Sequence, residues 1–442
     1  MADRAVSDHP AVQAQLDRLA RLSPGADVLG LERIAALLAR LGNPERRLPP
    51  VLHVAGTNGK GSTCAFLRAA VEAAGLAAHV YTSPHLVRFN ERIRLAGKPV
   101  GDEALAALLE ETLEAAQGME ISFFEATTAA AFLVFARTAA DAAIVEVGLG
   151  GRLDATNVIP DPMVCGIAQL GLDHQAFLGG RIEQVAAEKA GIAKRGVPLV
   201  TQHYPPAIAD RIGEAAAKAG ADWLPRGGRW DAAVYQKKIH YRDAGGRIDL
   251  PLPRLPGAHQ AMNAALAVAM LRHQQALRIP ESALKAAMGW AEWPARLQRL
   301  AEGPLRGLLP AGAELWLDGG HNPAAARAVA DFFRAHVPAD RPFHLVLGML
   351  ANKDVAGVLK PFAGRAVTLH PVPVEGHEHH SPAALATTAR ETGLAAVPAA
   401  GVEDALGWIA RHADRARPPI VLIFGSLYLA GQVLRENGQL PV

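Results

Sequence analysis

Cysteine is scarce in this sequence, with only Cys64 and Cys165 among 442 residues. Two cysteines are too few for a disulfide framework, which favours a reducing compartment and hence a cytoplasmic location. The first ten residues include charged side chains and lack the apolar core of a secretory signal. No uncharged stretch is long enough to span a bilayer, so we expect no membrane partner.

Charge of either sign is not in excess. The chain has 45 Lys and Arg against 43 Asp and Glu, which gives a net charge of +2. A balance this even provides no general attraction to nucleic acid or to an anionic membrane. Half of the residues are apolar and a fifth are charged, as in an ordinary globular enzyme. The length exceeds what one hydrophobic core usually serves, so we expect two domains.

Strand-like apolar runs alternate with helical patterns along the chain. The predicted strands are Pro50–Gly56, Ala77–Thr82, Asp141–Gly148 and Pro162–Ala168. The predicted helices among them are Gly61–Ala74, Asp102–Ala116 and Ala126–Ala139. Such alternation is typical of an α/β fold with a parallel sheet covered by helices on both faces. Ligands then gather at the carboxyl ends of the strands.

An interruption of the alternating strand and helix patterns predicts the domain boundary. The stretch "GWAEWPARLQRLAEGPLRG" interrupts the alternation with Pro294 and Pro304, and the alternation restarts after it. We therefore predict an N-terminal domain over residues 1–293, built on a P-loop-type parallel sheet. A smaller C-terminal α/β domain, Rossmann-like, is predicted over residues 294–442.

The stretch "HVAGTNGKGS", which ends at Ser62, is the first candidate site. A predicted strand ends at Ala55, glycines follow, and a helix begins near Gly61, which is the setting of a phosphate-binding loop. The spacing differs from the Walker pattern G-x-x-x-x-G-K-[ST], because a glycine follows Lys60. We expect Lys60 to reach the β- and γ-phosphates, and Ser62 or Thr63 to face a metal. The alternative is a tight turn with a solvated lysine.

The stretch "IVEVGLGGRLDATN" (Ile144–Asn157) places Glu146 near the end of an apolar strand. If its two valine neighbours face one side of the sheet, Glu146 faces the other. A buried carboxylate is costly without a cation, and Mg²⁺ prefers oxygen ligands, so Glu146 is a candidate magnesium ligand. A salt-bridged glutamate is the alternative. The glycine run after it would bring Arg152 and Asp154 to a substrate.

Asp173 and His174 follow a further strand, and a helix from Arg181 carries Glu188 and Lys189. Histidine is a poor default ligand for magnesium, so spacing alone favours a structural or acid–base role for His174. By the same standard, Lys189 has the pattern of a helix-surface lysine, the commoner case for any lysine.

The second domain begins with "LWLDGGHNPAAA". Asp318 ends a strand there, and Pro323 suits the first helical turn after Asn322. The turn is either a plain capped βα turn or a second part of the nucleotide site, since paired domains often share a ligand cleft. The loop "GHEHHSP" (Gly376–Pro382) lacks the ordered ligand spacing of a zinc site, so solvated loop histidines are the favoured interpretation.

These segments occur together and in this order in one family. The segments are "GTNGKGS" (Gly56–Ser62), "TSPHLVRFNERI" (Thr82–Ile93), "FFEATT" (Phe123–Thr128), "EVGLGGRLDATN" (Glu146–Asn157), "LDH" (Leu172–His174), "EKAGI" (Glu188–Ile192), "HQAMNA" (His259–Ala264), "PARLQ" (Pro294–Gln298), "DGGHNP" (Asp318–Pro323) and "GMLANKD" (Gly348–Asp354). The chain resembles the Mur ligase superfamily and, within it, the bacterial bifunctional dihydrofolate synthase/folylpolyglutamate synthase family.

This resemblance implies an ATP-dependent ligase of folate biosynthesis. In the family, ATP phosphorylates a substrate carboxylate, and the amino group of L-glutamate then displaces the phosphate to form an amide. The implied substrates are dihydropteroate, reduced folates, L-glutamate and ATP, and the implied cofactor is Mg²⁺, as two ions. The family's tendency is monomeric, and the even charge suggests nothing else.

The resemblance also implies a role for each matching residue. The expected ATP-binding residues are Thr57, Asn58, Gly59, Lys60, Gly61, Ser62, Asn263, Arg296, Asp318, His321 and Asn322. The expected catalytic residues are Lys60, Glu146, His174 and Lys189. The expected magnesium ligands are Ser83, Glu146, His174 and Lys189, the last as a carbamate, which turns a cation into an anion. The expected substrate-binding residues are Leu29, Gly30, Phe123, Phe124, Arg152, Leu153 and Asp154.

Three segments depart from the family pattern. Gly320 stands where the family has alanine, and Gln175 follows His174 where threonine is usual. The loop "EGHEHH" (Glu375–His380) stands where relatives carry an arginine. If that arginine helps to bind folate or glutamate in relatives, this chain extends polyglutamate chains without it or not at all.

Two other functions are compatible with parts of the pattern. A Mur-type ligase acting on a UDP-sugar peptide would share the loop and the second domain. The spacing around Phe123–Thr128 and the lack of an extra N-terminal UDP-binding domain favour the folate ligase over it. A nucleotide-gated binding protein would use the same loop, but Glu146, His174 and Lys189 would then be superfluous.

Overall fold

The structure of the protein is a computed structural model that describes residues 5–22, 29–338, 340–364 and 367–441. The chain divides into two compact units. The first contains Met1–Arg254 and His259–Glu292, and the second contains Leu255–Ala258 and Trp293–Pro441. No helix in the described part of the chain is long and apolar enough to cross a membrane.

The first unit is built on an eight-stranded sheet in the order β4-β3-β2-β5-β1-β6-β7-β8. Its strands are β1 Val51–Ala55, β2 Ala78–Tyr81, β3 Ile93–Leu95, β4 Lys98–Pro99, β5 Ala142–Glu146, β6 Val164–Ile167, β7 Pro198–Thr201 and β8 Asp222–Pro225. The six strands from β2 to β8 in that order run parallel, and β3 and β4 add an antiparallel edge. Because β2, β5, β1 and β6 are neighbours, the four loops that follow them leave from one edge of the sheet.

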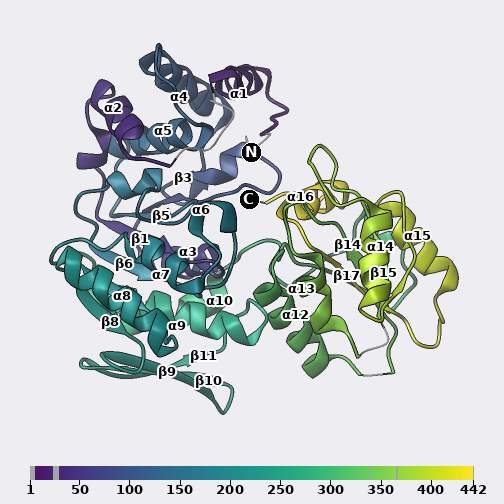
Figure 1. Ribbon diagram of the computed structural model, residues 1–442. Coiled ribbons are helices and arrows are strands. Elements are labelled where there is room, and N and C mark those ends of the chain that lie inside the picture. Colours follow the sequence, from purple (N-terminus) through teal and green to yellow (C-terminus); the bar gives the residue numbers. More distant parts are fainter. Residues whose placement is uncertain (1–4, 23–28, 339, 365–366, 442) are drawn as a thin grey trace. The chain divides into compact units, whose positions relative to one another are not determined.

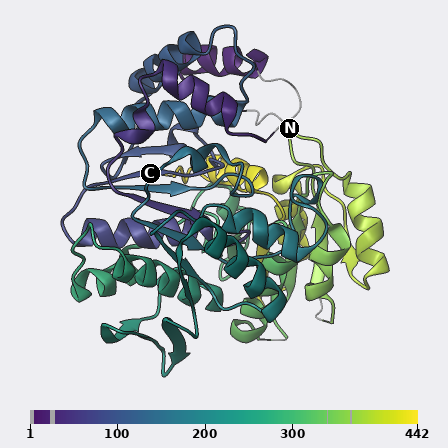
Figure 2. The ribbon, with the colours of Figure 1, turned by 60° about the vertical axis from the view of Figure 1, so that its left-hand side comes forward.

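Helices cover both faces of this sheet. They are α1 Pro10–Leu22, α2 Glu32–Arg40, α3 Lys60–Ala73, α4 Asp102–Ala115, α5 Phe123–Arg137, α6 Gln175–Leu178, α7 Ile182–Ala190, α8 Pro206–Ala219, α9 Ala258–His273 and α10 Glu281–Trp290, with short 3-10 turns η1 Pro44–Arg46, η2 Phe89–Arg92 and η3 Ala155–Val158. In Figure 1 and Figure 2, α1, α2, α4 and α5 form one layer over the sheet. Their apolar side chains pack in one core with Tyr81, Ala143 and Val145 of the sheet.

Glu146 points away from that core. Ala143 and Val145 of β5 belong to it, and successive side chains of a strand face opposite sides. The carboxylate therefore lies on the face that α3 covers, because α3 contacts β5, β2 and β1.

A three-stranded antiparallel sheet completes the first unit and was not predicted. It consists of β9 Trp230–Tyr235, β10 Lys238–Asp243 and β11 Gly246–Pro251, in the order β11-β10-β9. Figure 1 shows this meander below α9 and α10. The ring of Trp230 stacks on that of Tyr241 across it, with centroids 5.9 Å apart.

The second unit has a six-stranded sheet in the order β12-β13-β17-β14-β15-β16, parallel except for the β12–β13 pair. Its strands are β12 Gln298–Arg299, β13 Glu314–Leu317, β14 Phe343–Leu347, β15 Val367–Pro371, β16 Ala395–Ala396 and β17 Ile420–Phe424. Its helices are α11 Pro304–Gly307, α12 Pro323–His336, α13 Val355–Leu359, α14 Pro382–Glu391, α15 Val402–His412 and α16 Leu427–Glu436, with the 3-10 turn η4 Lys360–Phe362. The predicted α/β class is confirmed.

One helix start was predicted wrongly. The helix expected from Ala126 begins at Phe123, because Ser122 and Glu125 form a capping box. The Ser122 hydroxyl accepts from the Glu125 amide over 3.2 Å, and the Glu125 carboxylate accepts from the Ser122 amide over 2.7 Å. These bonds satisfy two amides at the start of the helix. The guanidinium of Arg33 pairs with the same carboxylate at 3.0 Å.

Two histidines in the second unit make its stability sensitive to acid. His344 on β14 and His370 on β15 lie side by side, with Nδ1 of His344 3.0 Å from Nε2 of His370. Burial lowers the pKa of each imidazole from 6.5 to about 4. The unfolded chain therefore binds these protons at a higher pH than the folded chain does, and stability is lost as the pH falls from about 6.5 through about 4.

We predict that replacing both imidazoles by leucine (His344→Leu with His370→Leu) flattens the decline of the unfolding temperature between pH 6.5 and pH 4. Removing both partners removes the two buried imidazoles of this pair that would be protonated, and such paired apolar replacement is tolerated. Calorimetry across this pH range measures the slope. His336→Leu, at an exposed position of the same unit, is the control, and an unchanged slope in the double variant would contradict the assignment.

Candidate functional site

The glycine-rich loop joins β1 to α3. Gly59 lies at the N-cap of α3 with a left-handed φ of 86°. A Cβ atom at this position would lie 2.4 Å from Oδ1 of Asn263 on α9, so only glycine allows this approach. The loop and the buried Asn263 side chain are therefore in close contact, and two of the predicted ATP-binding residues lie together.

The start of the loop is tied to the strand beside it. The amides of Thr57 and Asn58 donate to the carbonyl of Gln169, at 2.8 and 3.1 Å, and the Thr57 hydroxyl donates to the carbonyl of Gly171 at 2.9 Å. These two amides are thus engaged by the segment after β6. The amides of Lys60, Gly61 and Ser62 precede the first amide that bonds within the helix, that of Thr63 to the Gly59 carbonyl, and amides at such a position commonly face an anion.

Lys60 and Glu146 form a buried ion pair at the edge of the sheet. Nζ of Lys60 lies 3.8 Å from Oε1 of Glu146, and the two side chains are 16% and 5% exposed. Glu146 ends β5, and the Ser83 amide, just after the neighbouring β2, donates to its Oε2 over 3.4 Å. The structure therefore brings together three predicted residues from α3, β5 and the β2 loop.

Lys189 is buried, which overturns the helix-surface interpretation. It lies near the end of α7 and is 5% exposed. Burial lowers its pKa to about 7, the charge of Lys60 lowers it as well, and Asp154 and Asp173 act in the opposite direction. A large fraction of this amine is therefore neutral near pH 7, and an uncharged amine is nucleophilic.

The glycine-rich segment after Glu146 folds against α7. The Arg152 amide donates to the Glu188 carbonyl at 2.8 Å, and the Arg152 guanidinium, which is exposed, pairs with the Glu188 carboxylate at 2.8 Å. Asp154 accepts from the amides of Leu149 and Thr156, at 2.8 and 3.0 Å, and is 2% exposed. Both oxygens of Asp154 are thus engaged within its own loop, and this loop covers the end of the helix that carries Lys189.

The predicted substrate-binding residues differ in burial. Phe123 is 6% exposed and packs edge-on against Phe89 in the core. Phe124 is half-buried, and its ring stands where a Cβ atom of Gly148 would be, 2.4 Å from Cζ. Leu153 is half-buried next to Asp154, and Leu29 and Gly30 are half-buried just before α2.

His174 differs from Lys60 and Glu146 in its exposure to solvent. It is exposed and precedes the four-residue α6 with a left-handed φ of 51°. Its amide donates to the Asp173 carboxylate over 2.9 Å.

In the glycine-rich loop, the side chains of Ser62 and Thr63 are buried. The Thr63 hydroxyl donates to the Gly59 carbonyl over 2.9 Å, at the start of α3.

The second unit contains the other predicted ATP-binding residues. Asp318 follows β13, is 4% exposed, and accepts from the amides of Leu297 and Gly320 at 2.8 and 2.7 Å. It thereby joins the turn after β13 to the loop that carries the half-buried Arg296. Asn322 caps α12 by accepting from the Ala325 amide over 3.0 Å.

Two further details concern this turn. Nδ1 of His321 lies 3.1 Å from the Gly319 carbonyl oxygen. A Cβ atom at Gly320 would lie 2.8 Å from the Phe424 ring and 2.9 Å from Cβ of Ala325. The glycine that replaces the family's alanine therefore suits a position that is closely packed in this chain.

The loop histidines are packed rather than simply solvated. His377 stacks on Tyr428 with ring centroids 3.8 Å apart. Nδ1 of His379 lies 2.7 Å from the His377 carbonyl, and Nε2 of His380 lies 3.1 Å from the Lys353 carbonyl. All three imidazoles are half-buried and hold the loop to its neighbours.

Gln260 was missed by the sequence argument. It is 1% exposed on α9, and its Oε1 accepts from Nδ2 of Asn263 over 3.1 Å. Within the described residues, Nε2 of Gln260 has no hydrogen-bond partner. A buried donor of this kind next to the phosphate loop suits a ligand acceptor. Its spacing of three residues from Asn263 on a helix was the available signal.

The chain is similar to known protein families over most of its length. The Mur ligase middle domain matches residues 54–271, and the Mur ligase glutamate ligase domain matches residues 303–427. The folylpolyglutamate synthase of Lacticaseibacillus casei is 34% identical over 91% of this chain and 92% of its own. The dihydrofolate synthase/folylpolyglutamate synthase of Escherichia coli is 36% identical over 79% of this chain and 78% of its own.

Solved structures agree with these relatives. The E. coli FolC structure in complex with DHPP and ADP has a TM-score of 0.85 at 33% identity and covers 97% of each chain. The Mycobacterium tuberculosis folylpolyglutamate synthase complexed with ADP has a TM-score of 0.86 at 30% identity and covers 98% of this chain and 99% of its own. A bifunctional enzyme with Mn, AMPPNP and L-glutamate bound has a TM-score of 0.83 at 32% identity, with 98% and 99% covered. The chain therefore belongs to the Mur ligase superfamily and, within it, to the folylpolyglutamate synthase family of ATP-dependent ligases.

Proposed function

We propose that this protein joins L-glutamate to 7,8-dihydropteroate, and to reduced folates, in an ATP-dependent reaction through an acyl phosphate. The observation that carries the proposal is the buried charge cluster of Lys60, Glu146 and Lys189 at the edge of the sheet. The Lys60 ammonium beside Glu146 would complement the charge of a triphosphate and of a phosphorylated substrate, and Lys189 lies close enough for the Lys60 charge to lower its pKa. Family membership supplies the reaction class.

The proposed triphosphate site is the start of α3. The helix amides after Gly59 and the Lys60 ammonium would face the phosphates, and Asn263 and Gln260 would meet the nucleotide from α9. The unpartnered Nε2 of Gln260 supports a ligand at this place. Arg296, Asp318, His321 and Asn322 of the second unit are proposed as further ATP-binding residues, as the family resemblance implies.

Magnesium fits the oxygen donors at the edge of the sheet. Glu146 offers a buried carboxylate and Ser83 a hydroxyl, which are the hard ligands that Mg²⁺ prefers. The described residues include no cluster of three or more His, Cys, Asp or Glu placed to hold a metal. Mg²⁺ commonly takes one or two protein carboxylates and completes its shell with phosphate oxygens and water, so this donor set suits it. When bound, the ion supplies charge neutralisation for the phosphoryl oxygens.

We propose that His174 and Lys189, as a carbamate, hold a second magnesium ion. The neutral Lys189 amine would attack CO₂, form an N–C bond and release one proton. The product is an anion, so repulsion between Lys189 and Lys60 becomes attraction. This change suits a buried lysine whose pKa is already lowered to about 7.

During phosphoryl transfer, groups of this chain would stabilise the negative charge that develops on the phosphoryl oxygens. The substrate carboxylate attacks the γ-phosphorus, and ADP leaves. The Lys60 ammonium and the α3 amides stabilise the charge that spreads over the phosphoryl oxygens. The glutamate nitrogen then attacks the acyl carbon, and phosphate leaves as the amide forms.

The folate assignment is favoured over the two other functions. The relatives described above carry folate-ligase names, which favours a pterin acceptor over a UDP-sugar peptide. A nucleotide-gated switch has no use for a glutamate ligase domain, and that domain matches residues 303–427. Phe124, Arg152, Leu153 and Asp154 are proposed to form the pterin side of the site together with Phe123, Leu29 and Gly30.

The substrate assignment predicts that ADP is released only when a pterin acceptor and L-glutamate are both present. A coupled ADP assay with dihydropteroate and with tetrahydrofolate, side by side, measures this and separates first addition from chain extension. Reactions that lack glutamate are the control. Turnover with a UDP-sugar peptide, or hydrolysis without any acceptor, would overturn the assignment.

We predict that Lys60→Ala lowers kcat by roughly a hundredfold to a thousandfold, because a charge that stabilises the transferring phosphoryl group is lost. Steady-state rates at saturating substrates measure this. Lys218→Ala, at an exposed position on α8, is the matched control and should retain full activity. A Lys60→Ala enzyme with an unchanged rate would refute the role.

We predict that activity depends on CO₂ and falls as the pH drops below about 7, because the protonated Lys189 amine does not react with CO₂. Rates in buffers depleted of CO₂ and resupplied with it measure the dependence. Lys189→Ala should lose activity and recover part of it with added short carboxylates. Native mass spectra should show one bound CO₂ in the wild type. A CO₂-independent rate, with no such adduct, would contradict carbamylation.

A further inference from the structure

Helix α9 is anchored near both ends, and at its C-terminal end the anchor is the unpredicted meander. At its C-terminal end, the Arg272 guanidinium makes two 2.6 Å hydrogen bonds to the Asp243 carboxylate, at the end of β10. The Tyr241 hydroxyl donates to the same carboxylate at 2.9 Å, and Arg272 lies over the Tyr241 ring. A bidentate arginine–carboxylate pair fixes both the orientation and the separation of the two side chains, so it fixes the position of the C-terminal end of α9.

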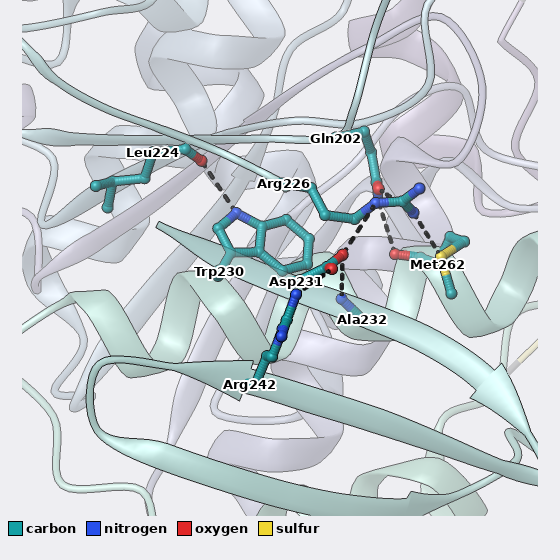
Figure 3. Close-up of polar contacts among 8 residues, drawn as sticks. All are labelled: Gln202, Leu224, Arg226, Trp230, Asp231, Ala232, Arg242 and Met262. Atoms are coloured by element: carbon teal, nitrogen blue, oxygen red, sulfur yellow. Dashed lines mark hydrogen bonds and ion pairs between the residues drawn. The ribbon is translucent and has the colours of Figure 1, made fainter. Parts of the chain in front are cut away.

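At the N-terminal end of α9, two side chains converge on Met262. Nε2 of Gln202, just after β7, donates to the Met262 carbonyl over 2.7 Å. The Arg226 guanidinium, after β8, reaches Oε1 of Gln202 at 3.3 Å and Sδ of Met262 at 2.7 Å. Figure 3 shows both side chains pointing toward Met262. A thioether is a weak acceptor, so Gln202 is the stronger anchor of the two.

The meander balances the charge of Arg226. Nε of Arg226 lies 4.0 Å from Oδ1 of Asp231 on β9, and Arg242 on β10 donates to Oδ2 of Asp231 over 3.1 Å. Figure 3 shows Asp231 between the two arginines. The Arg226 side chain thus contacts both Asp231 of the meander and Met262 of α9, and so links the two.

The residue after Met262 is the one that meets the phosphate loop. Asn263 is 5% exposed, and its Oδ1 lies 2.4 Å from the position that a Cβ atom of Gly59 would take. A displacement of this turn of α9 by a few tenths of an ångström would therefore move Asn263 against, or away from, the Gly59 turn at the start of α3.

We propose that Gln202 and Arg226 are positioning residues of the ATP site, which hold the first turns of α9 so that Asn263 lies against Gly59. The inference rests on the proposed ATP-dependent function. Neither residue touches the nucleotide loop, so both act through Met262 and its neighbour. The class of ligand affected is the nucleoside triphosphate, and glutamate and the pterin are expected to bind as before.

The test separates a loss of ATP affinity from a general loss of folding or activity. Gln202→Glu keeps an acceptor for Arg226 but removes the donor to the Met262 carbonyl, and Arg226→Ala removes the link to the meander. We expect each to raise KM for ATP roughly fivefold to tenfold, the effect of one part-buried hydrogen bond. The kcat at saturating ATP and KM for glutamate should stay within about twofold, because neither side chain meets the reacting groups.

Controls make the result decisive. Arg211→Ala removes an exposed ion pair with Glu214 on α8 and should leave KM for ATP unchanged. Arg226→Lys, which keeps the cation beside Asp231, should restore part of the affinity. If Arg226→Ala fails to fold, Gln202→Glu alone decides. An unchanged KM for ATP in folded Gln202→Glu, or an equal rise in KM for ATP and glutamate with loss of kcat, would overturn the inference.

The failure of this inference is distinguishable from that of the proposed function. If Lys60→Ala loses turnover while Gln202→Glu behaves as the wild type, only the positioning role fails. If the wild type consumes no ATP with any folate acceptor, the proposed function itself fails. Binding of a non-hydrolysable ATP analogue to Gln202→Glu, measured by calorimetry, gives the nucleotide affinity without turnover.

Discussion

The ion pair between Lys60 and Glu146 is the contact around which the candidate site is organised. Its 3.8 Å separation joins the first residue of a helix to the last residue of a strand. With both side chains largely buried, removing either partner would leave an uncompensated charge away from water. The pair is possible only because α3 covers the face of the sheet to which Glu146 points. Because β1 and β5 are neighbours in the sheet, the loop after β1 begins next to the end of β5, where Glu146 lies.

Lys189 adds a second cation to this edge and shifts the charge balance. A buried ammonium near another ammonium is unfavourable, and its pKa falls to about 7. Two outcomes relieve the cost: loss of the proton, or conversion to an anion. Both leave the Lys60–Glu146 pair intact. The glycine-rich segment after Glu146 closes over α7 through Arg152 and so buries the lysine.

Much of this arrangement was predictable from the sequence, and some of it was not. The strand–loop–helix order around Lys60, and the side of the sheet to which Glu146 points, followed from local periodicity. The burial of Lys189 did not, because it depends on the contact between the Arg152 amide and the Glu188 carbonyl, which are distant in sequence. Periodicity on one helix carries no information about a loop that covers it from elsewhere.

The meander was missed for a different reason. Its residues alternate in period two, with Ile239 and Tyr241 buried, but the turn that joins β9 to β10 lacks the usual signal. That turn is Gln236 and Lys237, with left-handed φ values of 48° and 58°. Glycine or asparagine normally occupies such positions. A hairpin built from a glutamine and a lysine therefore escapes turn rules, although its strands obey the alternation.

The loop Glu375–His380 departs from the family pattern, and the structure shows what its histidines contact. The ring of His377 is committed to stacking on Tyr428, and His379 and His380 are held at main-chain carbonyls. Imidazoles held in this way fix the loop to its neighbours, and the loop itself carries no arginine. If an arginine at this place binds glutamate in relatives, other groups of this chain would have to bind the anionic glutamate here. A difference in substrate range from such relatives would then originate in this loop and not at Lys60.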